Sequence, residues 1–327
     1  MRILAALLAG LALAFAPATL AQENDAASYT ALQGKDARLL AVGWRLVTGN
    51  ARFCEGAERR IGLLLHDVAT YGEPAAARAA FGLTGDIGAL SVAPGSPAAL
   101  AGMAQDATLT GFDDVPVATR FPPSDPNWQR LGTVYSALED ALEADGTVQL
   151  GWTNRDGTPG LSDITGVPAC PSRFEVRVGE NGAKAEGLRV MVGENFVGFG
   201  YPEDEFAAAV AHELAHNVLR HRELLDREGR GRSLVRLTER EADRLIPWLL
   251  ANAGYGAEAA LRFMENWGPR HGGGLLRART HDGWDERRDF IAAEIALIEQ
   301  VIADEGTADW SRHFVRDVPA RLLAKGG

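Results

Sequence analysis

The chain lacks an excess of positive charge, and after its first residues it also lacks long apolar segments. Its 33 Lys and Arg residues stand against 44 Asp and Glu residues, a net charge of −11. This balance argues against a nucleic-acid-binding protein and against binding to anionic membrane surfaces. No stretch after Ala21 is apolar over the length of a membrane span. No repeats or low-complexity tracts occur beyond an enrichment in alanine.

The remaining composition is that of a folded protein. Hydrophobic residues make up 46% and charged residues 24% of the 327 residues. A chain of this length can form two domains with real cores. We therefore expect a globular chain and not a disordered one.

The N-terminus has the pattern of a secretory signal. Met1-Arg2 is followed by the apolar run ILAALLAGLALAFAPATLA and by small residues before Gln22. This predicts a signal peptide over residues 1–21. No cysteine follows directly, so a lipoprotein anchor is not expected. We expect an exported protein, in the periplasm or secreted.

Only two cysteines are present, Cys54 and Cys170. An oxidising compartment permits them to pair. The bridge would close a loop of about a hundred residues, which chain-entropy arguments value at roughly 4 to 5 kcal/mol. The alternative is two buried free thiols.

Residues 22–77 are expected to form a segment of helix and strand that packs on the C-terminal domain. DARLLAVGWRLV at 36–47 has apolar residues at helical spacing, and RIGLLLHDV at 60–68 reads as a short buried strand. His66 in that strand is expected to be a satisfied core histidine.

The next segment has a β-rich pattern. From 81 to 117, short apolar runs alternate with Gly, Pro and Asp turns. A helical LGTVYSALEDALEADG and a strand TVQLGWTNRDG follow. This order, and VAPGSPAALAGM within it, resembles a PDZ domain of the bacterial, protease-associated kind over residues 78–158. Because the segment lies between the two cysteines, it reads as a module inserted into, or preceding, a larger domain.

The PDZ resemblance implies a peptide-binding loop. Phe81, Gly82 and Leu83 would match the loop whose backbone N–H groups receive a peptide's terminal carboxylate. The sequence departs from the family at Gln105-Asp106, where Gly-Asp is usual. The alternative is a purely structural module.

The C-terminal part begins with strands and continues with a helix. FEVRVGENGAKAEGLRVMVGENFVGFG contains apolar runs separated by Gly-Glu-Asn turns. Tyr201-Pro202 and three acidic residues suit the first turn of a helix. We expect that helix to run through FAAAVAHELAHNVLRH, to His221.

Two histidines of this helix are spaced as metal ligands. His212 and His216 lie four residues apart, so on a helix they share one face. Glu213 lies between them. His-Glu-x-x-His is the zincin pattern of two zinc ligands and a carboxylate that acts as general base on water. The alternative is a polar helix face.

A catalytic zinc needs a third protein ligand. The metzincin pattern fails, because Leu219 and Arg222 occupy the places of its Gly and His. His221 is one residue off that spacing. On a continuing helix it points away from the other two histidines, and we expect a surface or packing residue.

A following helix, LTEREADRLIPWLLANAGYG, offers a carboxylate instead. Glu239 and Asp243 are four residues apart on one face. Glu239 is expected to bind zinc, and Asp243 to accept the outer N–H of a ligating histidine. Glu241 points about 200° round the helix and is a poor ligand.

Together AAVAHELAHNVLRH and TEREADRL resemble the HtpX/Ste24-type zinc metallopeptidases, which are gluzincins. The resemblance covers roughly residues 170–300. It implies that the first Glu of Glu-x-x-Ala-Asp, here Glu239, is the third ligand. RTHDGWDER resembles the family's Thr-His-Pro segment and maps His281 and Arg287, with roles in orienting substrate, stabilising the oxyanion or closing the idle metal site. Asp282 replaces the proline, which is expected to loosen the loop.

The sequence thus predicts an α+β protein. A mainly helical zincin domain with a small β-sheet, residues 159–327, joins the PDZ-like domain. One Zn²⁺ per chain and protein or peptide substrates are expected. A binding protein with a PDZ-like module and little turnover is the alternative. A serine hydrolase has only HGGG at 271–274 in its favour, since no Gly-x-Ser-x-Gly turn exists; those glycines are expected to form a mobile loop over the cleft.

Overall fold

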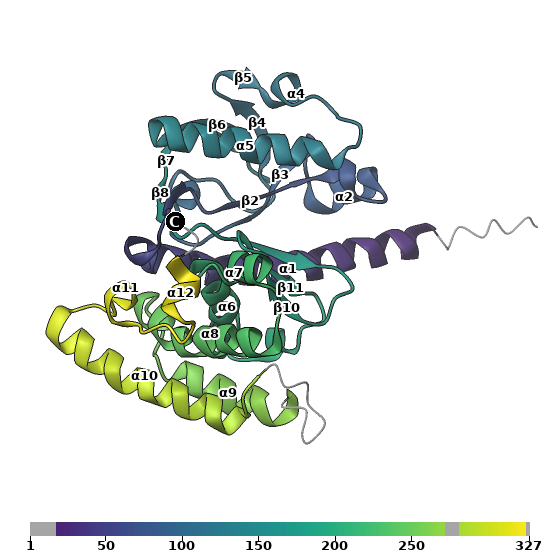
Figure 1. The fold of residues 1–327 in the computed structure, drawn as a ribbon. Helices are drawn as coiled ribbons and strands as arrows, with labels where there is room; N and C mark the ends of the chain where they lie inside the picture. Colours follow the sequence, from purple (N-terminus) through teal and green to yellow (C-terminus); the bar gives the residue numbers. More distant parts are fainter. Residues whose placement is uncertain (1–17, 272–280, 325–327) are drawn as a thin grey trace, which may run out of the picture.

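The computed structural model describes residues 18–271 and 281–324, and the fold is α+β (Figure 1). The fold class expected from the sequence is therefore confirmed. Of the expected signal peptide, residues 1–17 lie outside the described part. Among the described residues, no helix has the length and apolarity that crossing a membrane requires.

Helix α1, Ala18–Gly49, runs between two parts of the molecule (Figure 1). The upper part contains residues 63–165, and the larger part contains residues 173–323. Leu39, Val42 and Leu46 recur at helical spacing and are buried in the larger core. Leu40 and Trp44 lie on another face and pack against Ala93 of the upper part. The helix expected over 36–47 is confirmed, and its two apolar faces join both parts.

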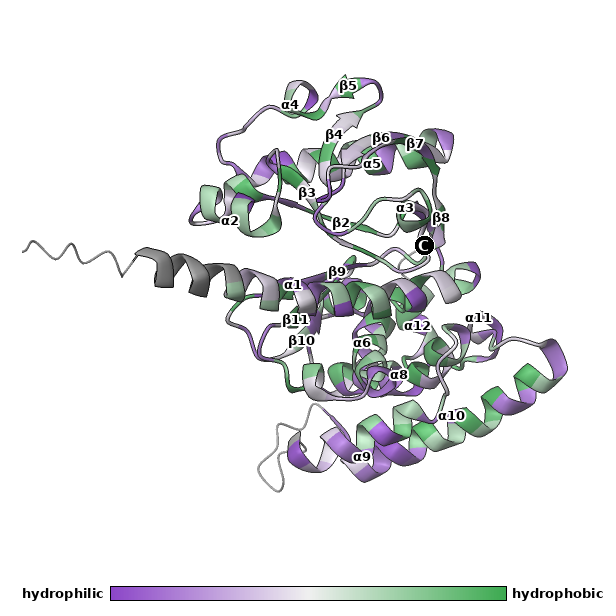
Figure 2. Ribbon diagram, turned by 180° about the vertical axis from the view of Figure 1, so that it is seen from behind, coloured by the Kyte–Doolittle hydropathy of each residue, from purple (hydrophilic) through white to green (hydrophobic). Residues whose placement is uncertain are grey.

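The larger part is mainly helical. Its sheet has the order β10-β11-β9, with β9 and β11 parallel and β10 and β11 antiparallel. Figure 2 shows apolar and polar residues alternating along its outer helix α10, as in an amphipathic helix that covers a core. Its elements are β9 Arg173–Arg177, β10 Ala183–Ala185, β11 Arg189–Gly193, η3 Val197–Gly200, α6 Glu203–Val218, α7 His221–Glu228, α8 Arg232–Asn252, α9 Ala259–His271, α10 Trp284–Glu305, α11 Trp310–His313 and α12 Ala320–Leu323.

The start of α6 is held by α1. Arg38 donates hydrogen bonds to the carbonyl oxygens of Phe199 and Tyr201, each at 2.6 Å. Further along, Asn50 donates to the carbonyl oxygen of Leu249 in α8 at 3.0 Å. Both helices that carry the candidate site are thus fixed to α1 or to the residue that directly follows it.

The upper part is a β-sheet covered by α5. The strand order is β2-β3-β4-β6-β7, with β5 paired to β4, and all neighbours are antiparallel. Val134, Leu138 and Leu142 of α5 lie at helical spacing and fill this core. Its elements are β2 Leu63–Asp67, η2 Val68–Thr70, α2 Pro74–Phe81, β3 Ile87–Val92, α3 Pro97–Leu100, β4 Thr108–Phe112, β5 Val115–Pro116, α4 Val117–Arg120, α5 Trp128–Asp145, β6 Thr147–Thr153 and β7 Pro159–Thr165.

This sheet is wider than the segment 78–158 in which a PDZ-like domain was expected. Strand β2 precedes that segment, and β7 follows it. The unit therefore includes the strand expected at 60–68. His66 in β2 is buried, and its Nδ1 lies 3.1 Å from the Tyr71 hydroxyl. Its Nε2 has no hydrogen-bond partner among the described atoms, so the histidine is a core residue that is only half satisfied.

The chain leaves and re-enters the larger part at one point. Strand β1, Glu58–Arg60, pairs antiparallel with β8, Val167–Ala169. Next to them, beyond the short helix η1 (Ala51–Phe53), Cys54 and Cys170 form a disulfide. The predicted pairing is confirmed, and a disulfide fits an exported protein. The upper part is an insertion whose base is closed by a covalent bond.

The prediction that residues 81–83 form a carboxylate-binding loop is wrong. Phe81 is the last residue of α2 and is buried, as is Leu83. The N–H of Gly82 donates to Ala79 and that of Leu83 to Arg78, so these amides close the helix. Phe81, Gly82 and Leu83 form a helix C-terminus and not a loop with free N–H groups.

Candidate metal centre

Helix α6 carries two histidines whose rings meet at the wall of a cleft. His212 and His216 are one helical turn apart and project from the same side. Their Nε2 atoms are 3.3 Å apart. The rest of α6 is rich in alanine, and these small side chains let neighbouring helices approach closely in the core.

Helix α8 brings a carboxylate to this pair. The Oε2 atom of Glu239 lies 3.4 Å from the Nε2 of His212 and 3.7 Å from that of His216. These three side chains, alone among the described residues, bring their donor atoms close enough to share one metal ion. The ligand set expected from the sequence is thus brought together from two helices.

The donor set fits a metal ion such as zinc. Two imidazoles and one carboxylate match the protein ligands of a catalytic zinc, which leaves a fourth position open. Burial opposes protonation of His212, yet Asp243 and Glu239 raise its pKa to about 10. Burial would raise the pKa of Glu239, but contacts with His212, His216 and His281 hold it well below its usual value. Metal binding must therefore displace a proton from this cluster.

Asp243 lies behind His212, as predicted. Its Oδ1 is 3.0 Å from the Nδ1 of His212. Arg287, at the start of α10, donates from Nε to Oδ2 and from Nη2 to Oδ1 at 2.6 and 2.7 Å. Burial would raise the pKa of Asp243, but the charge of Arg287 lowers it to about 2. The carboxylate therefore stays charged beside the histidine.

The guanidinium group of Arg287 is not free to bind substrate as an unpaired arginine would be. Arg287 reaches the cleft wall, but it is 6% exposed, and two of its nitrogens are engaged by Asp243. Its contacts support the orientation of Asp243 and hence of His212. A direct contact with substrate remains a prediction.

Helix α6 ends before the residue at which the sequence predicted its end. Arg220 has a left-handed backbone with φ 55°, and His221 begins α7. The turn brings the Nδ1 of His221 to 2.9 Å from the Nδ1 of His216. The ring is 1% exposed. The expectations that His221 lies at the surface and points away from the other two histidines are therefore wrong, because the helix does not continue through it. The interpretation as a buried packing residue is confirmed.

Two ionisable groups stabilise this buried arrangement. Burial lowers the pKa of His221 to about 4, so the ring is neutral at physiological pH. Burial would raise the pKa of Glu241, but its hydrogen bond with His221 and the charge of Arg316 lower it. Glu241 is therefore a buried anion, and as predicted it does not join the ligand group.

His281 lies beside the ligand group. Its Nε2 is 2.9 Å from the Oε2 of Glu239, and the side chain is 43% exposed. The next residue, Asp282, accepts a hydrogen bond from the Nε of Arg240 at 2.8 Å. Asp282, which stands in place of the family's proline, thus ties the described residues just before α10 to α8.

A cleft of about 970 Å³ opens over these residues. Glu213, which directly follows His212 in α6, lines the cleft together with His212 and His216. Phe263 and Trp267 of α9 add an apolar wall. The arrangement combines a candidate metal site, a carboxylate and a space large enough for several residues of an extended chain.

One strand edge faces this cleft. Strand β10 and its flanks line it, and no other described strand pairs with the outer side of β10. Strand β11 offers no edge to a peptide, because it lies between β10 and β9 and both its edges are paired. The available edge belongs to β10.

Three features of the site have no signal in the sequence pattern. A continuous helix would turn His221 away from the other two histidines, so the pattern does not indicate its contact with His216. Nothing in the pattern links Glu241 to Arg316, which is 75 residues away. The short, polar β10 has too weak an alternation to identify an edge strand. The glycines expected to form a mobile loop, Gly272 to Gly274, lie outside the described residues.

Comparison of the chain with protein-family models, with curated proteins and with solved structures finds no match. Any functional conclusion therefore rests on the chemistry of this chain's own residues.

Proposed function

We propose that the protein is an exported, zinc-dependent endopeptidase that hydrolyses peptide bonds of protein substrates. The observation that carries the proposal is the meeting of His212, His216 and Glu239 under a cleft that Glu213 also lines. A metal held only for structure usually has four closed protein ligands and needs no general base. The HtpX/Ste24-type resemblance supports the same activity.

Zinc held by His212, His216 and Glu239 would supply Lewis-acid activation of water and of the scissile carbonyl. Glu213 would take a proton from the attacking water on its carboxylate and pass it to the leaving amine. Asp243 would keep the Nδ1 proton on His212, so that its Nε2 lone pair faces the cleft. His281, beside Glu239, is placed to contact a substrate or to cover the site when idle.

The substrate would lie along β10 in an extended conformation. Main-chain pairing with an exposed strand edge binds peptides with little dependence on side chains. The aromatic wall of Phe263 and Trp267 would accept an apolar side chain. We propose that export proceeds through the N-terminal signal and that the periplasm, where a disulfide can form, is the site of action.

The test is chelator-sensitive cleavage of casein by the purified protein. Glu213→Gln should keep bound zinc and lose proteolysis, because the amide cannot take a proton from water. Wild-type-like cleavage by this variant would refute the assignment. If zinc is bound and no substrate in a proteome-wide digest is cleaved, a zinc-containing PDZ-like binding protein is the better description.

A further inference from the structure

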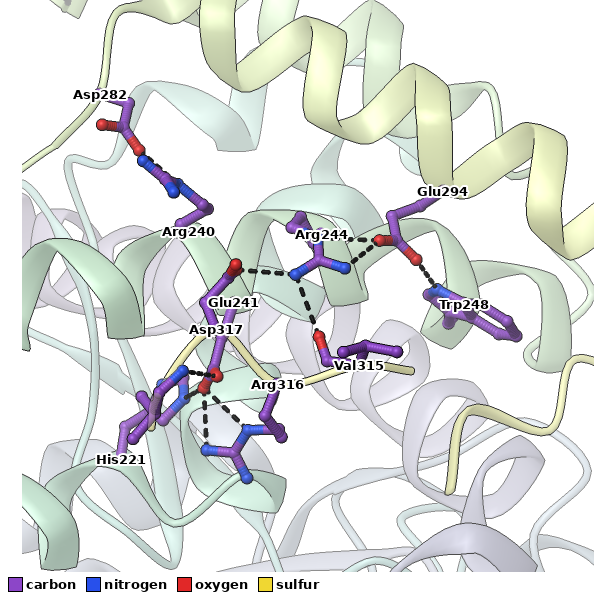
Figure 3. A network of polar contacts seen from close by, with 11 residues as sticks. His221, Arg240, Glu241, Arg244, Trp248, Asp282, Glu294, Val315, Arg316 and Asp317 are labelled. Atoms are coloured by element: carbon purple, nitrogen blue, oxygen red, sulfur yellow. Dashed lines mark hydrogen bonds and ion pairs between the residues drawn. The ribbon is translucent and has the colours of Figure 1, made fainter. Parts of the chain in front are cut away.

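A second row of buried polar groups extends from His216 into the protein, and its first member, His221, also borders the cleft. His221 Nδ1 lies 2.9 Å from His216 Nδ1, and His221 Nε2 lies 2.9 Å from the Oε2 of Glu241. Arg316 donates from Nε to the same oxygen at 2.8 Å (Figure 3). The row joins α6, α7 and α8 to the segment after α11.

This row is closed to solvent at its centre. His221 is 1% and Glu241 0% exposed. The second oxygen of Glu241 accepts the backbone N–H of Val318 at 2.7 Å. Arg316 also donates to the carbonyl oxygen of Leu219, at the turn where α6 ends, at 3.4 Å. The buried carboxylate of Glu241 is bonded at both oxygens, so its position and orientation are fixed.

The partners fix which atom donates in every bond. Glu241 is a carboxylate that accepts from Arg316 and Val318, so His221 Nε2 must donate to it. Because Arg316 already pairs with the charge of Glu241, a protonated His221 would bury an unpaired charge, so the ring is neutral. A neutral imidazole that donates from Nε2 can only accept at Nδ1. His216 must therefore carry its proton on Nδ1. Its Nε2 lone pair is then free and points toward Glu239 and His212.

The two candidate histidine ligands are thus supported in the same manner by unrelated residues. His212 has Asp243 behind its Nδ1, and Asp243 is held by Arg287. His216 has His221 behind its Nδ1, with Glu241 and Arg316 beyond. In metal sites such outer partners set the ring orientation and the tautomer of the ligand.

We propose that His221 is a positioning residue for the metal site: it takes its orientation from Glu241 and Arg316 and holds His216 in the tautomer that can bind a metal through Nε2. The inference rests on the proposed zinc site. It assigns a role to the C-terminal segment, because Arg316 and Val318 would fix a ligand more than ninety residues earlier in the chain.

Three variants test this role through zinc affinity, measured by competition with a chelator on folded protein. Glu241→Gln replaces both acceptor oxygens by one oxygen and one NH₂ group, which meets a donor in either orientation: the Val318 N–H, or Arg316 and His221. The charge and the acceptor pair that hold the proton on His221 Nε2 are lost, and with them the fixed tautomer of His216. His221→Leu removes the partner. His221→Gln offers one acceptor and one donor and should rescue binding.

We expect zinc affinity to fall about 10 to 100-fold in Glu241→Gln and His221→Leu, and to stay near wild type in His221→Gln. Glu294→Gln is the matched control. Glu294 is also a buried carboxylate paired with an arginine, Arg244, and with the Trp248 indole, but it does not contact the histidines (Figure 3).

Circular dichroism of each variant reports whether it is folded. If His221→Leu does not fold, Glu241→Gln and His221→Gln still decide the matter. Unchanged zinc affinity in Glu241→Gln overturns the positioning role, as does an equal loss in Glu294→Gln. Wild-type protein that binds no zinc overturns the proposed function as well. Tight zinc binding without proteolysis in wild type refutes only the proposed function.

Discussion

Arg287 and Asp243 form a two-bond ion pair at 2.6 and 2.7 Å that is almost fully buried, and Asp243 is also the neighbour of His212. Paired geometry of this kind fixes the plane of the carboxylate as well as its position. The orientation of His212 therefore depends on a residue from α10, a helix that supplies no ligand.

Asp243→Asn should lower zinc affinity by about 10 to 100-fold while the protein stays folded. The amide keeps the size of the side chain but loses the charge that holds both Arg287 and the Nδ1–H of His212. Zinc competition with a chelator measures the effect. Asp317→Asn is the control, since Asp317 pairs with Arg244 and not with the histidines; equal losses in both variants would contradict the prediction.

A proline in β10 should abolish cleavage without disrupting the sheet if substrates pair with this edge. Gly193 N–H donates to Gly182 and Glu186 N–H to Arg189. Because antiparallel pairs alternate, the N–H of Ala185 points away from β11. Ala185→Pro removes only that outward donor.

We expect Ala185→Pro to raise the KM for an unfolded protein substrate or to eliminate cleavage, with zinc still bound. Ala185→Val adds bulk but keeps the N–H, and it should cleave at a rate close to that of wild type. Normal cleavage by Ala185→Pro would show that substrates bind elsewhere.

The stability of the protein should depend on pH through Asp36. Burial raises the pKa of this side chain to about 7, and it accepts a hydrogen bond from the Val176 N–H. The folded state thus keeps a proton that the unfolded chain releases above about pH 4. Its contribution to stability is present at low pH and is lost as the pH rises to about 7.

Asp36→Asn should therefore increase the free energy of unfolding at pH 8 by roughly 2 to 4 kcal/mol and change it little at pH 4. Urea unfolding at both pH values, with chelator present, measures this. The exposed Asp140→Asn should show no such difference. A destabilised Asp36→Asn at pH 8 would mean that the charge itself is needed.

Replacing Cys54 and Cys170 together by alanine should lower the free energy of unfolding by roughly 3 to 5 kcal/mol. The bond joins residues 116 positions apart and closes the base of the inserted part. Denaturant titration of the double variant beside wild type, with and without reductant, provides the measurement. If reductant destabilises both proteins equally, the disulfide is not the cause.

Local patterns were sufficient for several features. Helices α6 and α8 follow from apolar periods of about 3.6 residues, which depend only on neighbouring residues. The four-residue spacings of His212 with His216 and of Glu239 with Asp243 place each pair on one helix face. The disulfide followed from the number of cysteines and from the compartment. The PDZ-like identity of the insertion and the peptidase activity remain predictions.

Other features depended on details that no periodicity carries. A single left-handed residue, Arg220, ends α6 and turns His221 inward. The extent of the inserted sheet is set by its two edge strands: β2 pairs with β3, and β7, which begins about a hundred residues later in the chain, pairs with β6. The N–H groups of Gly82 and Leu83 close the C-terminus of α2, and no sequence pattern distinguishes this role from a binding loop.

By itself, the sequence determined which side chains can be ligands, because their chemistry and spacing along a helix are local properties. The tertiary structure alone decided which residues lie behind those ligands. His221, Glu241 and Arg316 come from three separate segments, and only packing of α7, α8 and the C-terminal segment around α6 brings them into one buried row. Burial then makes each hydrogen bond obligatory, since an unpaired polar group in the core would cost the folded state free energy.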